Sequence, residues 1–333
     1  MNDTLIGMST ELRVDDVRRV WADENHNAFT DLCRFDGAFF LTFRSCPEGH
    51  PISPAAFVRV LRSTDAESWD EVFSFSVPNR DTRDPHFLVY DDRLFVYSGT
   101  WPAGADSGRK DLNGHLGFCA VSADGFDWEG PTPMETTRGY YIWRAAAYGG
   151  KAYLCGRRKR DFATLPTVEE EYPIQESVML ESTNGFDWRP AGLFQEEYGN
   201  ETAFVFQSDG EVVALARNRV GPALLCRSAP PYSDWRRSRL SHNIGGPMLA
   251  WWDDRLVAGG RKTTAETGPV TQLYWIEEDE LVEAAILPSA GDNSYPGFVA
   301  LSADRALVSY YSSHEGSGEP LYPAAVYLAT IGR

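Results

Sequence analysis

A β-hairpin pattern occurs six times along this chain of 333 residues, and it constrains the fold more than any other feature. Each copy has two short apolar, β-rich runs joined by a polar turn, as in residues 202–217, where Ser208-Asp209-Gly210 separates the runs. The turns fall near positions 36, 91, 149, 209, 253 and 304, about 44 to 60 residues apart. This period is typical of the blades of a β-propeller, each of which has four strands.

The second half of each unit completes the blade. After most hairpins come a short β run and a tight polar turn closed by tryptophan, at residues 63–69, 122–128 and 182–188 and, in degenerate form, 228–235. Serine, aspartate or asparagine, and glycine at fixed offsets suit a turn with side-chain-to-backbone hydrogen bonds and a positive φ. The last unit supplies only three clear strands, so we expect residues 11–21 to form its outermost strand and close the ring. The sequence therefore predicts one all-β domain over residues 1–333, a six-bladed β-propeller of four-stranded antiparallel blades.

Charge and composition limit the partners. A formal charge of −17 and a pI near 4.8 argue against nucleic acid or an anionic membrane surface. The five cysteines are widely spaced and form no CxxC pair, which indicates buried free thiols. The N-terminus lacks the apolar core of a signal peptide, so we expect a cytoplasmic location. No motif implies a metal or an organic cofactor, because no two histidines have zinc-ligand spacing, and the sequence leaves the oligomeric state open.

Candidate site residues gather at one face of the predicted propeller. The loop leading into the innermost strand of a blade and the loop leaving the second strand open on the same face, where sites are usually built. We expect this face to carry His26, Arg44, His50, Arg83, Asp84, Arg144, Glu201, Arg217, Arg261, Tyr295 and Tyr310.

Arginine ends four of the six hairpins at what looks like an equivalent position: Arg44, Arg157, Arg217 and Arg261. Guanidinium groups bind carboxylates in a bidentate way and stay charged at any relevant pH. A cluster of them on an otherwise acidic protein favours an anionic ligand, and the alternative is that each pairs with a neighbouring Asp or Glu.

The four tryptophan-closed turns resemble the Asp box of the sialidase superfamily, and three further segments extend this resemblance. In that family a glutamate before a strand polarises a tyrosine nucleophile, and an arginine at the end of the next strand belongs to a triad that grips the substrate carboxylate. The resemblance implies these roles for Glu201 and Arg217. Ser294-Tyr295-Pro296 is similar to the position of the nucleophilic tyrosine, and Asp84-Pro85 resembles an element that lines the pocket.

Other positions depart from the family pattern. His26-Asn27-Ala28 stands where the family has its first arginine, and Gly268-Pro269-Val270 stands near the third, so Arg44 and Arg261 are positional substitutes. The expected acid aspartate is missing from the loop after the first hairpin, which offers Glu48 and His50 instead.

The resemblance implies an exo-acting, sialidase-like glycoside hydrolase for a glycan with a terminal anionic sugar. The expected catalytic residues are Glu201, Tyr295, Asp84 and His50, and the expected substrate-binding residues are Arg44, Arg217, Arg261, His26, Arg83, Arg144 and Tyr310. One alternative is a lyase for uronic-acid glycans, in which His26 or His242 acts with a tyrosine while arginine neutralises the carboxylate. Another is a carbohydrate-binding propeller without catalysis.

Overall fold

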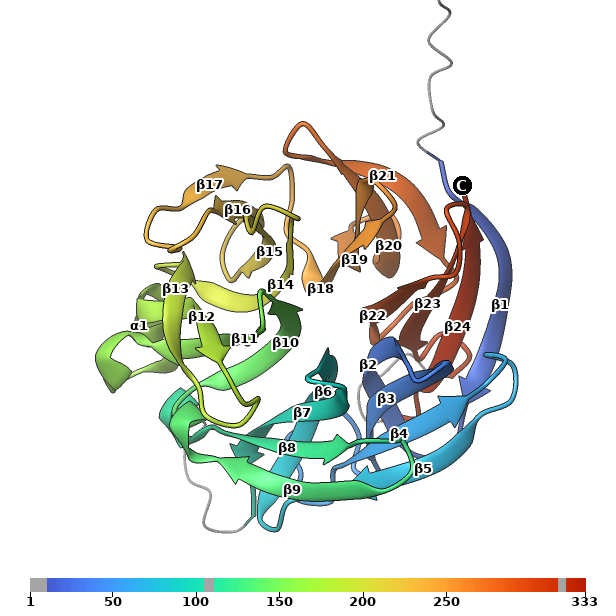
Figure 1. The fold of residues 1–333 in the computed structure, drawn as a ribbon, viewed down its shortest axis with the longest axis horizontal. Coiled ribbons are helices and arrows are strands. Elements are labelled where there is room, and N and C mark those ends of the chain that lie inside the picture. The colour runs from blue at the N-terminus through green and yellow to red at the C-terminus, as the bar shows by residue number, and fades with distance from the viewer. Residues whose placement is uncertain (1–10, 105–110, 317–321) are drawn as a thin grey trace, which may run out of the picture.

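The computed structural model describes residues 11–104, 111–316 and 322–333, and these form a ring of six four-stranded antiparallel sheets (Figure 1). The predicted six-bladed β-propeller is confirmed. In each of blades one to five the strands follow chain order from the centre of the ring outward.

The strand bounds of the first three blades are as follows. Blade one has β2 (His26–Phe35), β3 (Ala38–Cys46), β4 (Phe57–Ser63) and β5 (Asp70–Phe75). Blade two has β6 (Arg80–Tyr90), β7 (Arg93–Pro102), β8 (Leu116–Ser122) and β9 (Trp128–Met134). Blade three has β10 (Tyr141–Tyr148), β11 (Lys151–Lys159), β12 (Gln175–Ser182) and β13 (Arg189–Gln195).

The last three blades continue the pattern. Blade four has β14 (Gly199–Phe206), β15 (Val212–Asn218), β16 (Leu224–Ser228) and β17 (Arg236–Arg239). Blade five has β18 (Gly245–Trp252), β19 (Arg255–Thr264), β20 (Gly268–Glu277) and β21 (Glu280–Leu287), and blade six has β22 (Asn293–Ala300), β23 (Arg305–Ser312), β24 (Ala325–Gly332) and β1 (Arg13–Trp21). Short helical turns lie in the connections: η1 (Leu112–Gly114), η2 (Glu135–Thr137), η3 (Arg160–Phe162), α1 (Val168–Glu171) and η4 (Tyr172–Ile174).

The N-terminal strand closes the ring. Strand β1 pairs antiparallel with β24, from Arg13 opposite Gly332 to Trp21 opposite Val326, and is the outermost strand of blade six. This is the strand predicted for residues 11–21, and it joins the two ends of the chain by backbone hydrogen bonds.

The polar turns between the third and fourth strands have the predicted hydrogen bonds. In the turn after β8, Ser122 Oγ accepts from the backbone N–H of Gly125 at 2.8 Å, and Asp124 Oδ1 accepts from the N–H groups of Phe126 and Asp127. The turn after β12 repeats this geometry with Asn184 in place of the aspartate. These turns lie at the opposite end of the blades from the loops predicted to carry the site.

Every innermost strand carries a bulge, which positions the site. In each blade two residues of the first strand lie opposite one residue of the second. A bulge bends the strand and changes the direction of its side chains. The bulge residues are Phe29-Thr30, Asp84-Pro85, Trp143-Arg144, Asn200-Glu201, Gly246-Pro247 and Tyr295-Pro296.

The cysteines are free, as the sequence predicts. Four are buried and Cys33 is partly exposed. Burial raises the pKa of Cys155 to about 11, because it penalises the thiolate. No helix in the part of the chain that the structure describes is long and apolar enough to span a membrane.

Candidate functional site

Three predicted site residues form a hydrogen-bonded chain at the centre of the ring. Tyr295 Oη donates to Glu201 Oε1 at 2.9 Å, and Arg217 Nη1 donates to Glu201 Oε2 at 2.6 Å. The tyrosine and the glutamate belong to the bulges of blades six and four, and both are at least 90% buried. The Arg217 side chain is 29% exposed and so remains accessible to a ligand.

The protonation states of this chain follow from its surroundings. Burial raises the pKa of Tyr295, and the nearby Glu201 carboxylate raises it further. Burial alone would also raise the pKa of Glu201, but Arg217 and Arg157 outweigh it and hold that pKa below its ordinary value. The resting pair is therefore a neutral phenol hydrogen-bonded to a carboxylate.

The backbone of Tyr295 is held in the left-handed region, at φ +52°. Thr30 Oγ1 donates to its carbonyl oxygen at 2.8 Å, and Arg144 Nη2 donates to the carbonyl of Pro296 at 2.6 Å. The ring packs on Gly246, where an added Cβ would lie 2.5 Å from the nearest ring carbon. Contacts from three other blades thus fix the tyrosine, as a preorganised site requires.

Asp84 is the carboxylate next to this chain without a strong partner. It lies in the blade-two bulge at φ +49° and is 5% exposed. Its Oδ1 atom is buried and has no hydrogen-bond partner among the described residues. Burial raises the pKa of Asp84 to about 7, partly offset by Arg83 and reinforced by Glu201. A buried carboxyl group of this kind can act as an acid near neutral pH.

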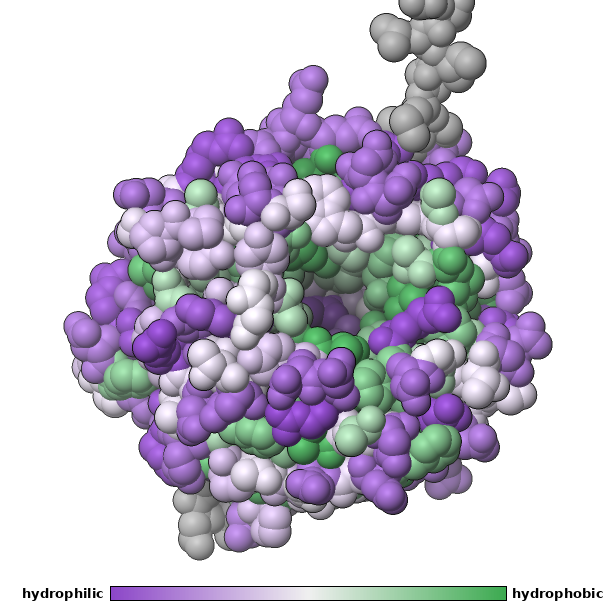
Figure 2. Space-filling model, viewed as in Figure 1, coloured by the Kyte–Doolittle hydropathy of each residue, from purple (hydrophilic) through white to green (hydrophobic). Residues whose placement is uncertain are grey.

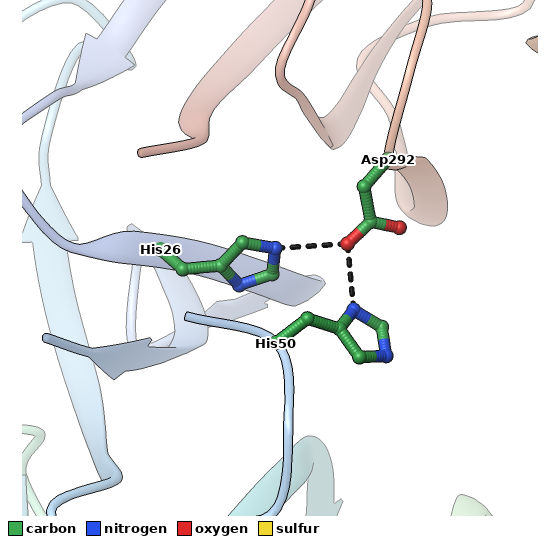
Figure 3. A group of neighbouring side chains, drawn as sticks. All are labelled: His26, His50 and Asp292. Carbon is green, nitrogen blue, oxygen red and sulfur yellow. Dashed lines mark hydrogen bonds and ion pairs between the residues drawn. The ribbon is translucent and has the colours of Figure 1, made fainter. Parts of the chain in front are cut away.

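Asp292, which the sequence analysis missed, organises a second cluster beside Tyr295. Its Oδ2 atom lies 2.8 Å from His26 Nε2 and 2.6 Å from His50 Nδ1, and both rings point at this one oxygen (Figure 3). Its Oδ1 atom accepts from Arg261 Nη2 and Tyr311 Oη, each at 2.9 Å. Burial would raise the pKa of Asp292, but its hydrogen bonds to the two histidines hold it well below the ordinary value.

The sequence feature that could have indicated Asp292 is its position in the chain. Asp292 lies in the loop leading into the innermost strand of blade six, three residues before Tyr295, at the face where the site was expected. Its histidine partners come from blade one, more than 240 positions away, so no local spacing connects them.

The same cluster is the group among the described residues with metal-ligand geometry. One ligand atom each from His26, His50 and Asp292 lies within 4.8 Å of the other two. Metal-binding histidines almost always donate their second ring N–H to a partner, whereas buried His26 Nδ1 has none among the described residues. Arg261 also places a positive charge on the carboxylate. Hydrogen bonding therefore accounts for the cluster better than a metal ion does.

Arg44 and Arg83 both form buried ion pairs with Asp81. Arg44 is fully buried, donates to both oxygens of Asp81 at 3.0 and 3.1 Å, and donates to the carbonyl of Gly49 at 3.0 Å. Arg83 donates to Asp81 Oδ2 at 2.5 Å and to the carbonyl of His50 at 2.9 Å. The clamp role expected for Arg44 does not fit this burial, and both arginines instead hold the loop that carries His50.

Arg144 is likewise buried rather than presented to a ligand. Its Nη1 atom donates to Asp31 Oδ1 at 2.7 Å, and Asp31 Oδ2 accepts from the backbone N–H of Phe87 at 2.9 Å. Together with the bond to Pro296, these contacts join blades one, two, three and six near the axis. Arg144 therefore stabilises the site through its bonds to Asp31 and to the Pro296 carbonyl.

The register corrects the expected equivalence of the four arginines. Arg44 and Arg261 each pair with the residue just before the bulge of their blade. Arg217 lies opposite its bulge, and Arg157 pairs one residue earlier still. The four arginines therefore occupy three different positions along the second strand relative to the bulge.

Tyr311, and not Tyr310, faces the site. Tyr310 is fully buried, and its hydroxyl donates to the carbonyl of Pro288 at 3.0 Å. Successive side chains of β23 point to opposite faces, so its neighbour Tyr311 lies against Phe29 and Tyr295, with ring centroids 5.6 and 6.1 Å away. Phe29, also missed by the sequence analysis, sits in the blade-one bulge between these rings and His50.

Two further candidates have other contacts. Glu48 is exposed, and its Oε2 atom accepts from Ser53 Oγ at 2.6 Å. His242 is half-buried between Tyr274 Oη, 2.9 Å from its Nε2, and Ser241 Oγ, 3.0 Å from its Nδ1.

The ring is hollowed at its centre, and hydrophilic residues are visible at depth (Figure 2). A cavity of about 190 Å³ is lined by the innermost strands of all six blades, on the side of the bulges nearer the hairpin turns. A larger cavity of about 490 Å³ lies between the outer parts of blades three and four, around Trp235 and Arg237. The catalytic candidates Glu201, Tyr295, Asp84 and His50 line neither of these two cavities.

Comparison with solved structures shows where this fold occurs. The chain superimposes on a protein of unknown function from Dyadobacter fermentans with a TM-score of 0.77 at 19% identity, over 96% of this chain and 99% of that one. Trypanosoma rangeli sialidase gives 0.66 at 12% identity, over 92% of this chain and 55% of the sialidase. An α-L-arabinofuranosidase from Fusarium graminearum gives 0.62 at 12% identity, over 92% and 97%. The chain matches no protein-family model and no curated protein sequence. At these identities the comparisons establish a propeller fold that is shared with glycoside hydrolases.

Proposed function

We propose that the protein is a glycoside hydrolase that forms a covalent glycosyl intermediate on Tyr295. The observation that carries this proposal is the hydrogen bond of 2.9 Å from Tyr295 Oη to Glu201 Oε1, with Arg217 on the other carboxylate oxygen. A phenol is a weak nucleophile until a carboxylate accepts its proton, and covalent capture divides a difficult displacement into two easier steps.

The first step breaks the glycosidic bond. Tyr295 Oη attacks the anomeric carbon while its proton passes to Glu201, and the leaving oxygen takes a proton from Asp84. Because the resting pair keeps the proton on the phenol, proton transfer and attack occur together. Arg217 stabilises Glu201 in its ionised form before the reaction.

The second step releases the sugar. Asp84, now ionised, removes a proton from water, whose oxygen attacks the anomeric carbon. The bond to Tyr295 breaks, and the phenol recovers its proton from Glu201. We assign Arg217 and Arg261 to contacts with substrate, since their side chains are 29% and 23% exposed. Arg44, Arg83 and Arg144 support the site without touching substrate.

A covalent trap tests this mechanism. Trypanosoma rangeli sialidase has been solved as a covalent intermediate with 2,3-difluorosialic acid. Fluorine beside the anomeric carbon slows both steps, and a good leaving group restores the first, so the intermediate accumulates. We expect a panel of activated fluoroglycosides, including difluorosialic acid, to yield one adduct, with peptide mass spectrometry placing the added mass on Tyr295. Labelling of any other residue would contradict the assignment, and Tyr295→Phe is the matched control that should remain unlabelled.

Asp84 should impose a pH limit on turnover. As a general acid with a pKa of about 7 it must be protonated to act, so kcat/KM should fall about tenfold per pH unit above pH 7. Asp84→Asn should lose on the order of 10²-fold in kcat with ordinary leaving groups. An aryl leaving group with a low pKa needs little protonation and should restore the first step. A pH profile unchanged by Asp84→Asn would rule out this role.

Folding stability gives an independent measure of the same carboxyl. The folded-state pKa of about 7 lies above the ordinary 3.8, so between these values the folded protein binds more protons than the unfolded chain. Stability from this group is therefore lost as pH rises through that window. We expect Asp84→Asn to be more stable than the native protein by on the order of 4 kcal/mol at pH 8, and by much less at pH 4, in urea unfolding.

The Asp292 cluster favours β-elimination as a second candidate function. Asp292 orients His50 through Nδ1, which leaves the other ring nitrogen of a 35% exposed side chain available as a base beside Tyr311 and Arg261. A lyase acting on uronate glycans would release an unsaturated product that absorbs near 235 nm. Absorbance from oligouronates without any fluoroglycoside adduct would select this function.

A further inference from the structure

We propose that Arg157 binds a carboxylate group of the glycan, in a subsite beside Tyr295 that spans blades two to four. The proposal rests on the proposed function only for the statement that the ligand is a glycan. The residue lies on β11, and no carboxylate forms an ion pair with it among the described residues.

The ion pairs around the axis set Arg157 apart. Arg44 and Arg83 share Asp81, whereas Arg144, Arg217 and Arg261 pair with Asp31, Glu201 and Asp292. Arg157 instead donates from Nη1 to the neutral Asn200 Oδ1 at 2.6 Å, and its buried Nε has no partner in the described chain. Its guanidinium therefore retains donors for an anion, in the planar arrangement that suits a carboxylate.

Neighbouring charges strengthen this preference. Burial lowers the pKa of Arg157, the Glu201 carboxylate opposes this shift, and the charges of Arg219 and Arg217 lower the pKa further. Arg219 stacks over the ring of Tyr172 at 3.8 Å. Arg157 therefore has two neighbouring guanidinium groups and one neighbouring carboxylate, in a protein whose formal charge is −17. A bound carboxylate would relieve this repulsion.

Aromatic rings complete the subsite. The guanidinium of Arg157 lies 5.2 Å from the centre of the Tyr141 ring, which holds it in place. Half-buried Trp101 packs against His115 and Tyr141, with ring centroids 3.9 and 6.0 Å away, and keeps part of its surface open to solvent. A flat aromatic surface near the guanidinium of Arg157 suits a sugar ring that carries an acidic substituent.

Binding to a non-hydrolysing variant tests the subsite apart from catalysis. In a Tyr295→Phe background, glucuronate- and galacturonate-terminated disaccharides are compared by calorimetry with their glucose and galactose counterparts. We expect Arg157→Gln to weaken binding of the uronates about 10- to 100-fold and to change binding of the neutral sugars less than about twofold. Arg157→Lys keeps the charge without the planar fork and should lose less than Arg157→Gln.

Arg158→Gln is the matched control. Arg158 is the next residue on the same strand, and its guanidinium is taken by Glu176 at 2.9 Å and Tyr140 Oη at 3.0 Å. Loss of uronate affinity equal to that of Arg157→Gln, equal losses for acidic and neutral sugars, or no uronate binding by the parent protein would overturn the proposal. Uronate binding that depends on Arg157 without hydrolysis of any glycoside would retain the subsite and reject the hydrolase.

Discussion

Replacing Tyr295 with phenylalanine is expected to lower kcat on the order of 10⁴-fold, as removal of a catalytic nucleophile does in other enzymes. The change removes one hydroxyl and keeps the ring that packs against Gly246 and Phe29. It also leaves Glu201 with its bond to Arg217, so the fold should persist. Steady-state kinetics on the best aryl glycoside, with circular dichroism and thermal unfolding, measures both effects.

Tyr310→Phe is the matched control, because its hydroxyl donates a partly buried hydrogen bond but points away from the site. It should cost about 1 kcal/mol of stability and leave kcat unchanged. Glu201→Gln should lower kcat by about 10² to 10⁴-fold. If Tyr295 and Glu201 act as a unit, the double variant should be little worse than Tyr295→Phe alone. Additive losses, or a larger loss in Tyr310→Phe, would refute the nucleophile assignment.

The architecture was predictable because it is encoded repeatedly. Six hairpins with regular turn chemistry leave few alternatives to a propeller, and the missing strand in the last unit required a partner from the other end of the chain. The pairing of β1 with β24 follows because the last unit has three strands of its own and each blade needs four. Glu201 and Tyr295 could be placed at the centre because each lies just inside an innermost strand.

Side-chain direction could not be predicted in the same way. The six bulges have no sequence motif in common, and each one shifts which residue faces the axis. A one-residue difference in strand position separates Tyr311, which contacts Tyr295, from Tyr310, which donates to a backbone carbonyl outside the site. The structure therefore places Tyr311 beside Tyr295 where the sequence indicated Tyr310, since strand side chains alternate with a period of two.

The ion-pair partners of the arginines could not be predicted from the sequence either. The sequence shows that arginines reach one face, but it does not show which carboxylate each one meets. Arg144 pairs with Asp31 and Arg261 with Asp292, from blades that are distant in the chain. Arg157 stands out only after all these pairs are known.

The buried ion pair of Asp81 should be the most sensitive point for stability, and Asp81→Asn is expected to cost about 3–5 kcal/mol. Asp81 is fully buried and accepts from Arg44, from Arg83 and from the backbone N–H of Ser53 at 3.0 Å. An amide of the same shape removes the negative charge and leaves two buried guanidinium groups without it. The free energy of unfolding in urea measures the cost, which is a large part of the total stability of a typical domain.

Asp91→Asn is the exposed counterpart of this change. Asp91 pairs with Arg93 at 3.2 Å, its side chain is 71% exposed, and its φ of +52° is one that asparagine tolerates. The expected loss is about 0–1 kcal/mol, because water screens the pair. Asp81 also holds the loop that carries His50, through Arg44 and Arg83, so folded Asp81→Asn protein should lose activity at temperatures where its circular dichroism is still native. A loss of stability no larger than that of Asp91→Asn would show that the arginines find other partners, and would remove the reason for excluding Arg44 from substrate binding.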